Sequence, residues 1–169
     1  MSTPEFTRPL DVRQAEGQMP HLEASEAERA ALARRFGLVS IARLAADLVL
    51  SRQDRVVSAE GRLSAAFVQS CAVSGEDLPV KIAEPIALHF VPPADSPESE
   101  EEIELEAEDL DEIEMEGTRF DLGEAVAQSL ALAIDPYLEG PGAEEVRKAG
   151  LLGQGESSPF AALKGLLKE

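Results

Sequence analysis

Acidic and apolar residues alternate in one stretch of the chain, and this pattern constrains the fold more than any other feature. Residues 95–116 include 13 acidic residues and neither lysine nor arginine. Apolar residues occupy every second position in two parts of the run: Ile103, Leu105 and Ala107, then Ile113 and Met115. Successive side chains of a β-strand point to opposite faces, so the alternation predicts strands with an apolar inner face and an acidic outer face.

The distribution of charge indicates what kind of partner the chain attracts. Removing these 13 negative charges from the net charge of −18 leaves −5 for the rest of the chain. A surface of this kind repels phosphate, which disfavours broad binding of RNA or DNA, and it attracts basic proteins. We therefore predict a docking face for a basic partner, made by Glu104, Glu106, Glu112, Glu114, Asp121 and Glu124. A solvated acidic face without a partner is the alternative.

Further strands are predicted by alternation elsewhere in the chain. Residues 5–12 fit a short extended segment, and residues 14–23 fit a polar loop. Residues 78–91 fit a strand, in which Pro85 suits a bulge or an edge. Residues 39–52 fit either a helix or a strand, and their β-branched residues favour the strand. Residues 55–72 predict a strand pair or one bent strand, broken at Glu60 and Gly61. Residues 74–77 have the composition of a turn.

Two helices have clear start and stop signals. Ser25 and Glu28 form a capping box at the start of the first helix, and Gly37 ends it. The second begins at Asp121 and ends before Pro136. Its apolar residues recur every four positions and predict a buried stripe: Leu122, Val126, Leu130 and Ile134.

These elements predict the α+β class, with two main helices on an antiparallel sheet that can curl toward a barrel. Residues 1–142 are predicted to form a single domain, with a mobile acidic loop at 92–102. Residues 143–169 are predicted to form a flexible tail that carries a short amphipathic segment at 159–167. The N-terminal residues lack the apolar core of a signal peptide, and no apolar run is long enough to span a membrane. We expect a cytoplasmic protein without a membrane partner.

The residue types that commonly carry catalysis or bind metal are sparse. Cys71 is the single cysteine, so an internal disulfide and a multi-cysteine zinc site are excluded, and no base stands beside it in the sequence. We interpret Cys71 as a half-buried strand residue, His21 as a loop residue and His89 as an exposed strand residue. The acidic run lacks the glycine that a calcium loop needs. We predict a protein that is not an enzyme and has no catalytic residues, bound metal or cofactor.

Six arginines between Arg29 and Arg55 form the main basic cluster. Arg34, Arg35 and Arg43 could contact RNA phosphate, which makes direct RNA binding the alternative function. The other interpretation of these residues is a helix face that balances the charge of the acidic strands.

Residues 110–137 read LDEIEMEGTRFDLGEAVAQSLALAIDPY, an acidic strand followed by an Asp-Leu-Gly-Glu helix start and a Leu-rich helix. This stretch resembles the YceD family, which is associated with accumulation of the large ribosomal RNA. The segment from Cys71 to Pro79 resembles that family's cysteine-containing turn. The first helix and residues 159–163 are similar to its alphaproteobacterial branch. The resemblance implies a non-enzymatic ribosome-biogenesis factor that supports accumulation of 23S ribosomal RNA.

The chain departs from the family pattern at two places. Many members carry a second cysteine where this chain has Ser74, and a cysteine cluster where it has residues 143–155. Those clusters suggest metal binding in such members, so metal is not part of the function that this chain would share with them. The expected partner is a basic ribosomal protein or assembly factor, with ribosomal RNA contacted indirectly.

Overall fold

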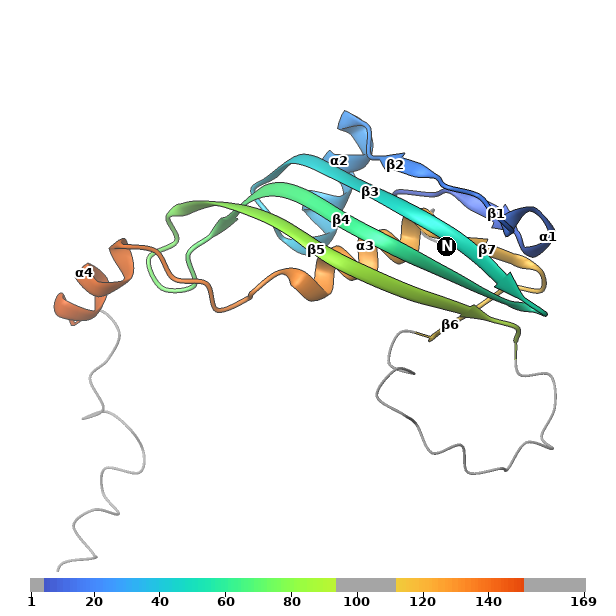
Figure 1. The fold of residues 1–169 in the computed structure, drawn as a ribbon. Helices are drawn as coiled ribbons and strands as arrows, with labels where there is room; N and C mark the ends of the chain where they lie inside the picture. Colours follow the sequence, from blue (N-terminus) through green and yellow to red (C-terminus); the bar gives the residue numbers. More distant parts are fainter. Residues whose placement is uncertain (1–4, 94–111, 151–169) are drawn as a thin grey trace, which may run out of the picture. The chain divides into compact units, whose positions relative to one another are not determined.

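The computed structural model describes residues 5–93 and 112–150, and they have an α+β fold, as predicted (Figure 1). The elements in chain order are β1 (Pro9–Asp11), α1 (Val12–Ala15), β2 (His21–Glu23), α2 (Glu26–Phe36), β3 (Ser40–Gln53), β4 (Val56–Ser70), β5 (Asp77–Val91), β6 (Glu112–Glu114), β7 (Arg119–Asp121), α3 (Leu122–Ala133) and α4 (Gly142–Lys148). None of the helices in these two ranges is long and apolar enough to cross a membrane.

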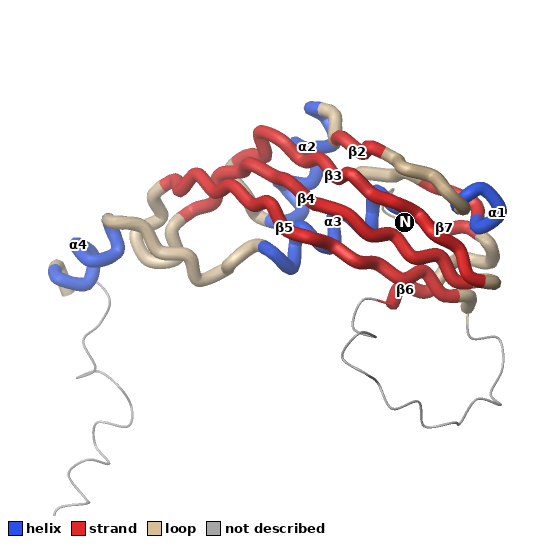
Figure 2. Tube along the Cα trace, in the orientation of Figure 1, coloured by secondary structure: helices blue, strands red, loops and turns tan. Residues whose placement is uncertain are grey.

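The main sheet has five strands in the order β2-β3-β4-β5-β6 and remains open at both ends of this order. The three long strands β3, β4 and β5 form its centre (Figure 2). β3 and β4 are antiparallel from the Ser40–Val68 pair to the Gln53–Val56 pair, whereas β6 runs parallel to β5. The sheet therefore does not close into a barrel, which the sequence left open as a possibility. Strands β1 and β7 form a separate antiparallel pair.

One face of the sheet is apolar because inward-facing residues alternate along the long strands. On β3 these are Leu44, Ala46, Leu48 and Leu50, each at most 2% exposed. Helices α2 and α3 both lie behind the long strands in Figure 1, on the face that this core occupies. Leu122, Val126 and Leu130 of α3 are fully buried, which confirms three positions of the predicted stripe, and Ile134 packs partly buried against the core.

The long strands agree with the sequence predictions except at one point. Residues 39–52 and 78–91 correspond to β3 and β5, so the preference for a strand over a helix was correct. The predicted break at Glu60 and Gly61 is wrong, because β4 continues through both residues. Gly61 instead permits a close approach, since a Cβ atom there would lie 1.8 Å from the carbonyl oxygen of Asp47 on β3.

The N-terminal region contains more regular structure than predicted. The extended segment at residues 5–12 contributes β1, which pairs with β7, but the chain then forms the single turn α1. The predicted loop at 14–23 includes β2, which pairs with residues 45–47 of β3. β2 has only three residues, which is too short for an alternation of apolar and polar residues to indicate a strand.

Both predicted helices are present with the predicted caps. Ser25 and Glu28 make both hydrogen bonds of the capping box, and Gly37 adopts the left-handed conformation that ends α2. The side chain of Asp121 accepts a hydrogen bond from the backbone N–H of Glu124 at the start of α3. This helix ends at Ala133, and its C-cap Ile134 lies two residues before Pro136.

The described residues fall into two compact units. The first comprises residues 5–69, 79–93 and 112–134, and the second comprises residues 70–78 and 135–150. Helix α4 belongs to the second unit, in a region where the sequence predicted the start of a flexible tail. The amphipathic segment at 159–167 and nearly all of the acidic loop at 92–102 lie outside the described residues.

Candidate partner-binding groove

Strand β6 presents glutamates on its outer face, as the alternation predicted. Glu112 and Glu114 are exposed, Ile113 between them is half-buried, and the next residue, Met115, is 3% exposed. β6 is held against β5 by parallel pairing, and beyond it the N–H of Met115 donates to the carbonyl of Val91 over 2.8 Å. Glu104 and Glu106, the other two strand glutamates of the predicted docking face, lie outside the described residues.

A groove of about 520 Å³ lies beside β6, within the first unit. Its apolar lining includes Phe90 and Phe120, whose ring centroids are 4.6 Å apart, together with Ile113. Four carboxylates also line it: Glu114, Glu116, Asp121 and Glu124. The groove therefore combines an apolar floor with an acidic rim. Three of these carboxylates were predicted from the sequence, whereas Glu116 was not selected although it continues the same alternation.

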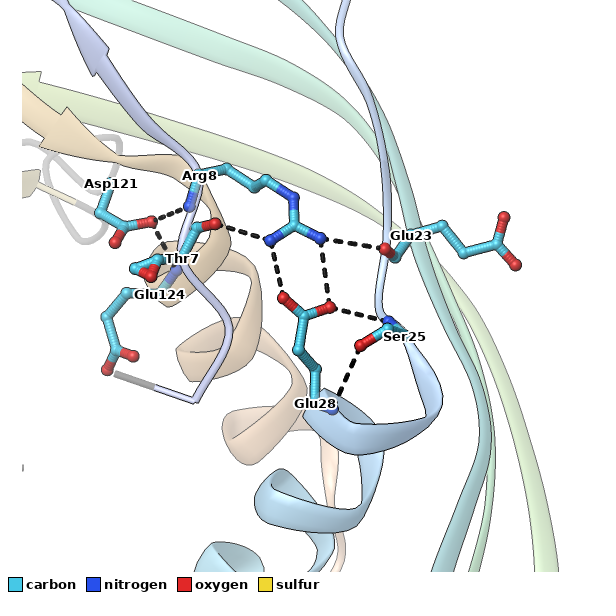
Figure 3. Close-up of polar contacts among 7 residues, drawn as sticks. All are labelled: Thr7, Arg8, Glu23, Ser25, Glu28, Asp121 and Glu124. Atoms are coloured by element: carbon cyan, nitrogen blue, oxygen red, sulfur yellow. Dashed lines mark hydrogen bonds and ion pairs between the residues drawn. The ribbon is translucent and has the colours of Figure 1, made fainter. Parts of the chain in front are cut away.

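Asp121 is held by backbone groups at the start of α3 (Figure 3). Its Oδ1 atom accepts hydrogen bonds from the N–H of Arg8 over 2.7 Å and from the N–H of Glu124 over 3.1 Å. The carboxylate thus caps the helix and fixes the N-terminal segment against it. This is a structural role, and it leaves less of Asp121 available to a partner.

Glu124 is also used inside the molecule. Both of its carboxylate oxygens accept from Arg35 on α2, over 2.8 and 3.0 Å, and Arg35 also binds Glu5 over 3.1 Å. The hydrogen bond with Arg35 is the main reason that the pKa of Glu124 is lowered. Among the described carboxylates of the predicted docking face, Glu124 forms an ion pair and Asp121 accepts backbone hydrogen bonds, whereas the side chains of Glu112 and Glu114 make neither contact with a described residue. Their role in docking stays a prediction.

Arg8 connects the N-terminal segment to α2, and sequence reasoning did not single it out (Figure 3). Its guanidinium donates to both carboxylate oxygens of Glu28, over 2.8 and 3.1 Å, and to the carbonyls of Thr7 and Glu23. It also lies 4.6 Å from the ring centroid of Phe6. The hydrogen bond from Arg8 is the largest cause of the lowered pKa of Glu28, which is about 2. The capping-box glutamate therefore has a second partner that is distant in sequence.

The basic cluster is partly used for internal contacts. Arg29 donates to the carbonyls of Ile41 and Ala42, which fixes α2 to β3, and Arg35 bridges Glu5 and Glu124. Arg34 and Arg43 are exposed and make no ion pair with a described residue. Direct RNA contact by Arg34, Arg35 and Arg43 stays a prediction, with Arg34 and Arg43 as its accessible members.

Cys71 organises the second unit through its sulfur atom. The residue is buried in the turn after β4 rather than half-buried within a strand. Its Sγ atom accepts hydrogen bonds from the N–H groups of Val73 and Ser74, both over 3.4 Å, and of Gly140 over 3.3 Å. The Ser74 side chain and then these N–H groups lower the pKa of the thiol to about 7. Ser74 therefore supports the sulfur through both its side chain and its backbone N–H.

The two histidines are in strands. His21 lies in β2 rather than in a loop, and its imidazole contacts Asp47 and Glu23, which raise its pKa, with the Asp47 hydrogen bond as the main cause. His89 lies in β5 as predicted, but it is half-buried and pairs with Glu112 of β6. Across residues 5–93 and 112–150, no group of three histidine, cysteine or acidic side chains is arranged to hold a metal ion.

The fold and the groove define a small acidic α+β protein with a surface groove that is lined by both apolar side chains and carboxylates. The chain belongs to the YceD family: the family model described as "Large ribosomal RNA subunit accumulation protein YceD" matches residues 59–167. The match includes β6, β7 and α3, which carry most of the groove. No curated protein and no solved structure matches the chain.

Proposed function

We propose that this protein is a non-enzymatic, cytoplasmic ribosome-biogenesis factor that supports accumulation of large-subunit ribosomal RNA by docking a basic ribosomal protein or assembly factor. The family description supports the connection to ribosomal RNA. The observation that carries the docking role is the pair Glu112 and Glu114, two exposed carboxylates on β6 that make no ion pair with any described residue.

Electrostatics favours a protein partner over direct RNA contact at this surface. Ribosomal RNA carries a dense array of phosphates, which carboxylates repel, whereas the proteins that coat it are basic. Complementary charge mainly accelerates and orients the encounter between two proteins. Asp121 adds to the negative potential of the groove while it accepts the backbone N–H of Arg8, whereas the charge of Glu124 is offset by the guanidinium of Arg35.

Charge reversal tests this proposal in growing cells. In the full-length chain, Glu104, Glu106, Glu112 and Glu114 are changed to Lys, and co-sedimentation with large-subunit precursors is measured at low salt. We expect the association to be lost. The matched control changes Glu60, Asp77, Glu84 and Glu145 to Lys, which are all exposed, so that the change in net charge is the same. Unchanged co-sedimentation of the first variant would contradict the proposal.

Direct RNA binding is the second candidate function, favoured by the exposure of Arg34 and Arg43. It predicts that the purified protein retards large-subunit RNA fragments in a gel and that its affinity falls steeply as salt rises. Changing Arg34 and Arg43 to Glu should then abolish the shift, whereas reversal of the β6 glutamates should strengthen it. The docking proposal predicts no such RNA complex.

A further inference from the structure

We propose that the groove beside β6 binds an arginine side chain of a basic protein segment. This inference rests on the proposed docking function and specifies which chemical group the partner presents. It follows from three features of the described residues. These are the apolar lining, the two rim carboxylates that have neither an ion pair nor a hydrogen bond with a described residue, and the way in which this chain binds its own arginines.

The lining of the groove suits the aliphatic stem of a long cationic side chain. Pro9 is exposed and Ile113 is half-buried, so both offer apolar carbon to a ligand, whereas Phe90 and Phe120 are only 0% and 5% exposed. Arginine and lysine both place apolar stems against such surfaces while their charged ends stay in water. A phosphate or a carboxylate would meet both an apolar floor and a rim of like charge.

Glu114 and Glu116 supply the acceptors for the cationic end. They flank Met115, which is buried, so their side chains point away from the core. Both line the groove, and neither forms an ion pair with a described residue. Of the other two lining carboxylates, Glu124 is paired with the guanidinium of Arg35 and Asp121 accepts the backbone N–H groups of Arg8 and Glu124, so the unsatisfied capacity for a cation lies at Glu114 and Glu116.

The chain's own ion pairs indicate why arginine should be favoured over lysine. Arg8 binds both oxygens of Glu28 and lies over the ring of Phe6. Arg35 binds both oxygens of Glu124 and lies 5.3 Å from the ring centroid of Phe36. A planar guanidinium can engage two carboxylate oxygens at once and pack flat against apolar groups, which an ammonium cannot do. The groove offers the same pairing of carboxylates with aromatic and aliphatic carbon.

Arg119 is the lining residue that opposes such a ligand. It is exposed, it lines the groove, and it pairs through its backbone with Glu116. Its positive charge should repel an incoming guanidinium. Removing this charge should therefore strengthen binding of the ligand in the groove. If the ligand were instead attracted non-specifically to distant acidic residues, the same change would strengthen binding far less.

The test is a nuclear magnetic resonance titration of the isotope-labelled full-length chain with three blocked pentapeptides. Each peptide has the sequence Gly-Leu-Xaa-Leu-Gly, where Xaa is arginine, lysine or the neutral isostere citrulline. We expect the arginine peptide to shift the amide signals of Ile113, Glu114, Phe120 and Glu124. The lysine peptide should bind several-fold more weakly, and the citrulline peptide at least about tenfold more weakly.

Variants of the same chain assign the effect to the groove. Glu114→Gln combined with Glu116→Gln should weaken binding of the arginine peptide about tenfold, and Arg119→Gln should strengthen it. Glu60→Gln combined with Glu84→Gln removes the same charge from exposed positions outside the groove and should change little. Equal binding of the arginine and citrulline peptides, or shifts confined to other residues, would overturn the inference. The inference would also be overturned if an RNA oligonucleotide shifted the same amide signals of the groove residues.

The outcome separates this inference from the proposed function. If the peptide fails to bind but the ribosomal association still depends on the β6 glutamates, the arginine groove is wrong and the docking role stands. If the peptide binds in the groove but charge reversal leaves the association intact, the docking role is wrong.

Discussion

At the scale of single residues, Glu28 is the clearest case of one side chain that stabilises two distant parts of the fold. It completes the capping box of α2 through the N–H of Ser25, over 2.7 Å, and it binds the guanidinium of Arg8. The ion pair joins residues that are 20 positions apart in the chain. Because the two interactions depend on different properties of the carboxylate, a substitution can remove one and keep the other.

Glu28→Gln is expected to reduce stability in a pH-dependent way. Glutamine also serves in a capping box, so the change removes the ion pair with Arg8 and keeps the cap. The pKa of Glu28 in the folded protein is about 2, below its ordinary value. Its stabilising contribution is therefore complete above about pH 5 and disappears as the pH falls toward about 2. We expect a loss of about 1–2 kcal/mol near neutral pH, because solvent screens this partly exposed pair.

Urea denaturation of both proteins across the acidic pH range measures this effect. The difference in the free energy of unfolding should be largest at neutral pH and should vanish at the acidic end. A difference that stays constant with pH would mean that Glu28 acts through packing or capping alone and that the ion pair contributes nothing.

At the scale of elements, the N-terminal strap (residues 5–11) depends on the first turn of α3. The N–H of Leu122 donates to the carbonyl of Arg8 over 3.1 Å, and Phe6 is fully buried. A Cβ atom at Gly123 would lie 2.5 Å from the carbonyl oxygen of Phe6. The glycine of the Asp-Leu-Gly-Glu helix start is therefore explained by packing, since it makes room for the backbone of the strap.

Gly123→Ala should destabilise the protein although alanine favours a helix more than glycine does. The gain in helix propensity is about 1 kcal/mol, but overlap with the strap costs about 1–3 kcal/mol and cannot be relieved by a rotamer change. We expect the free energy of unfolding to fall and the amides of Arg8 and Leu122 to exchange hydrogen faster. Leu132→Ala, at a position of α3 that is 84% exposed, is the control and should change stability by less than about 0.5 kcal/mol. Slower exchange in the Gly123 variant would refute the packing explanation.

At the scale of the whole molecule, the sequence predicted the elements far better than their assembly. Long alternating segments and capped helices carry strong local signals, so β3, β5, α2 and α3 were predicted close to their true bounds. β2 and α4 are short, and no periodic signal marks them. The groove could not be predicted as a site, because Phe90 and Phe120 reach it from strands that are distant in sequence. The same holds for the Arg35–Glu124 pair, whose members are 89 positions apart.

The assembly also explains why only some of the predicted acidic residues remain candidates for binding. Asp121 and Glu124 fit the sequence pattern of a charged face, yet in the fold Asp121 accepts the backbone N–H groups of Arg8 and Glu124, and Glu124 is paired with the guanidinium of Arg35. Glu114 and Glu116 receive no such partner among the described residues. Carboxylates that repel one another without internal compensation lower the stability of the folded state, and natural proteins retain such costs mainly at functional sites.

Neutralising the two unpaired rim carboxylates should therefore stabilise the protein while it weakens ligand binding. Folding brings Glu114 and Glu116 into one groove with Asp121, which has no ion pair with a described residue, and the unfolded chain largely lacks this repulsion. Glu114→Gln combined with Glu116→Gln should raise the free energy of unfolding by about 0.5 kcal/mol, or the melting temperature by about 1–2 °C, at about 0.01 M salt. At about 1 M salt, where screening is nearly complete, the difference should vanish.

Glu60→Gln combined with Glu84→Gln should show a smaller change at low salt, because neither residue lines the groove. Lower stability of the first variant at low salt would mean that these carboxylates are already compensated in the free protein, which would remove the electrostatic basis of the arginine groove.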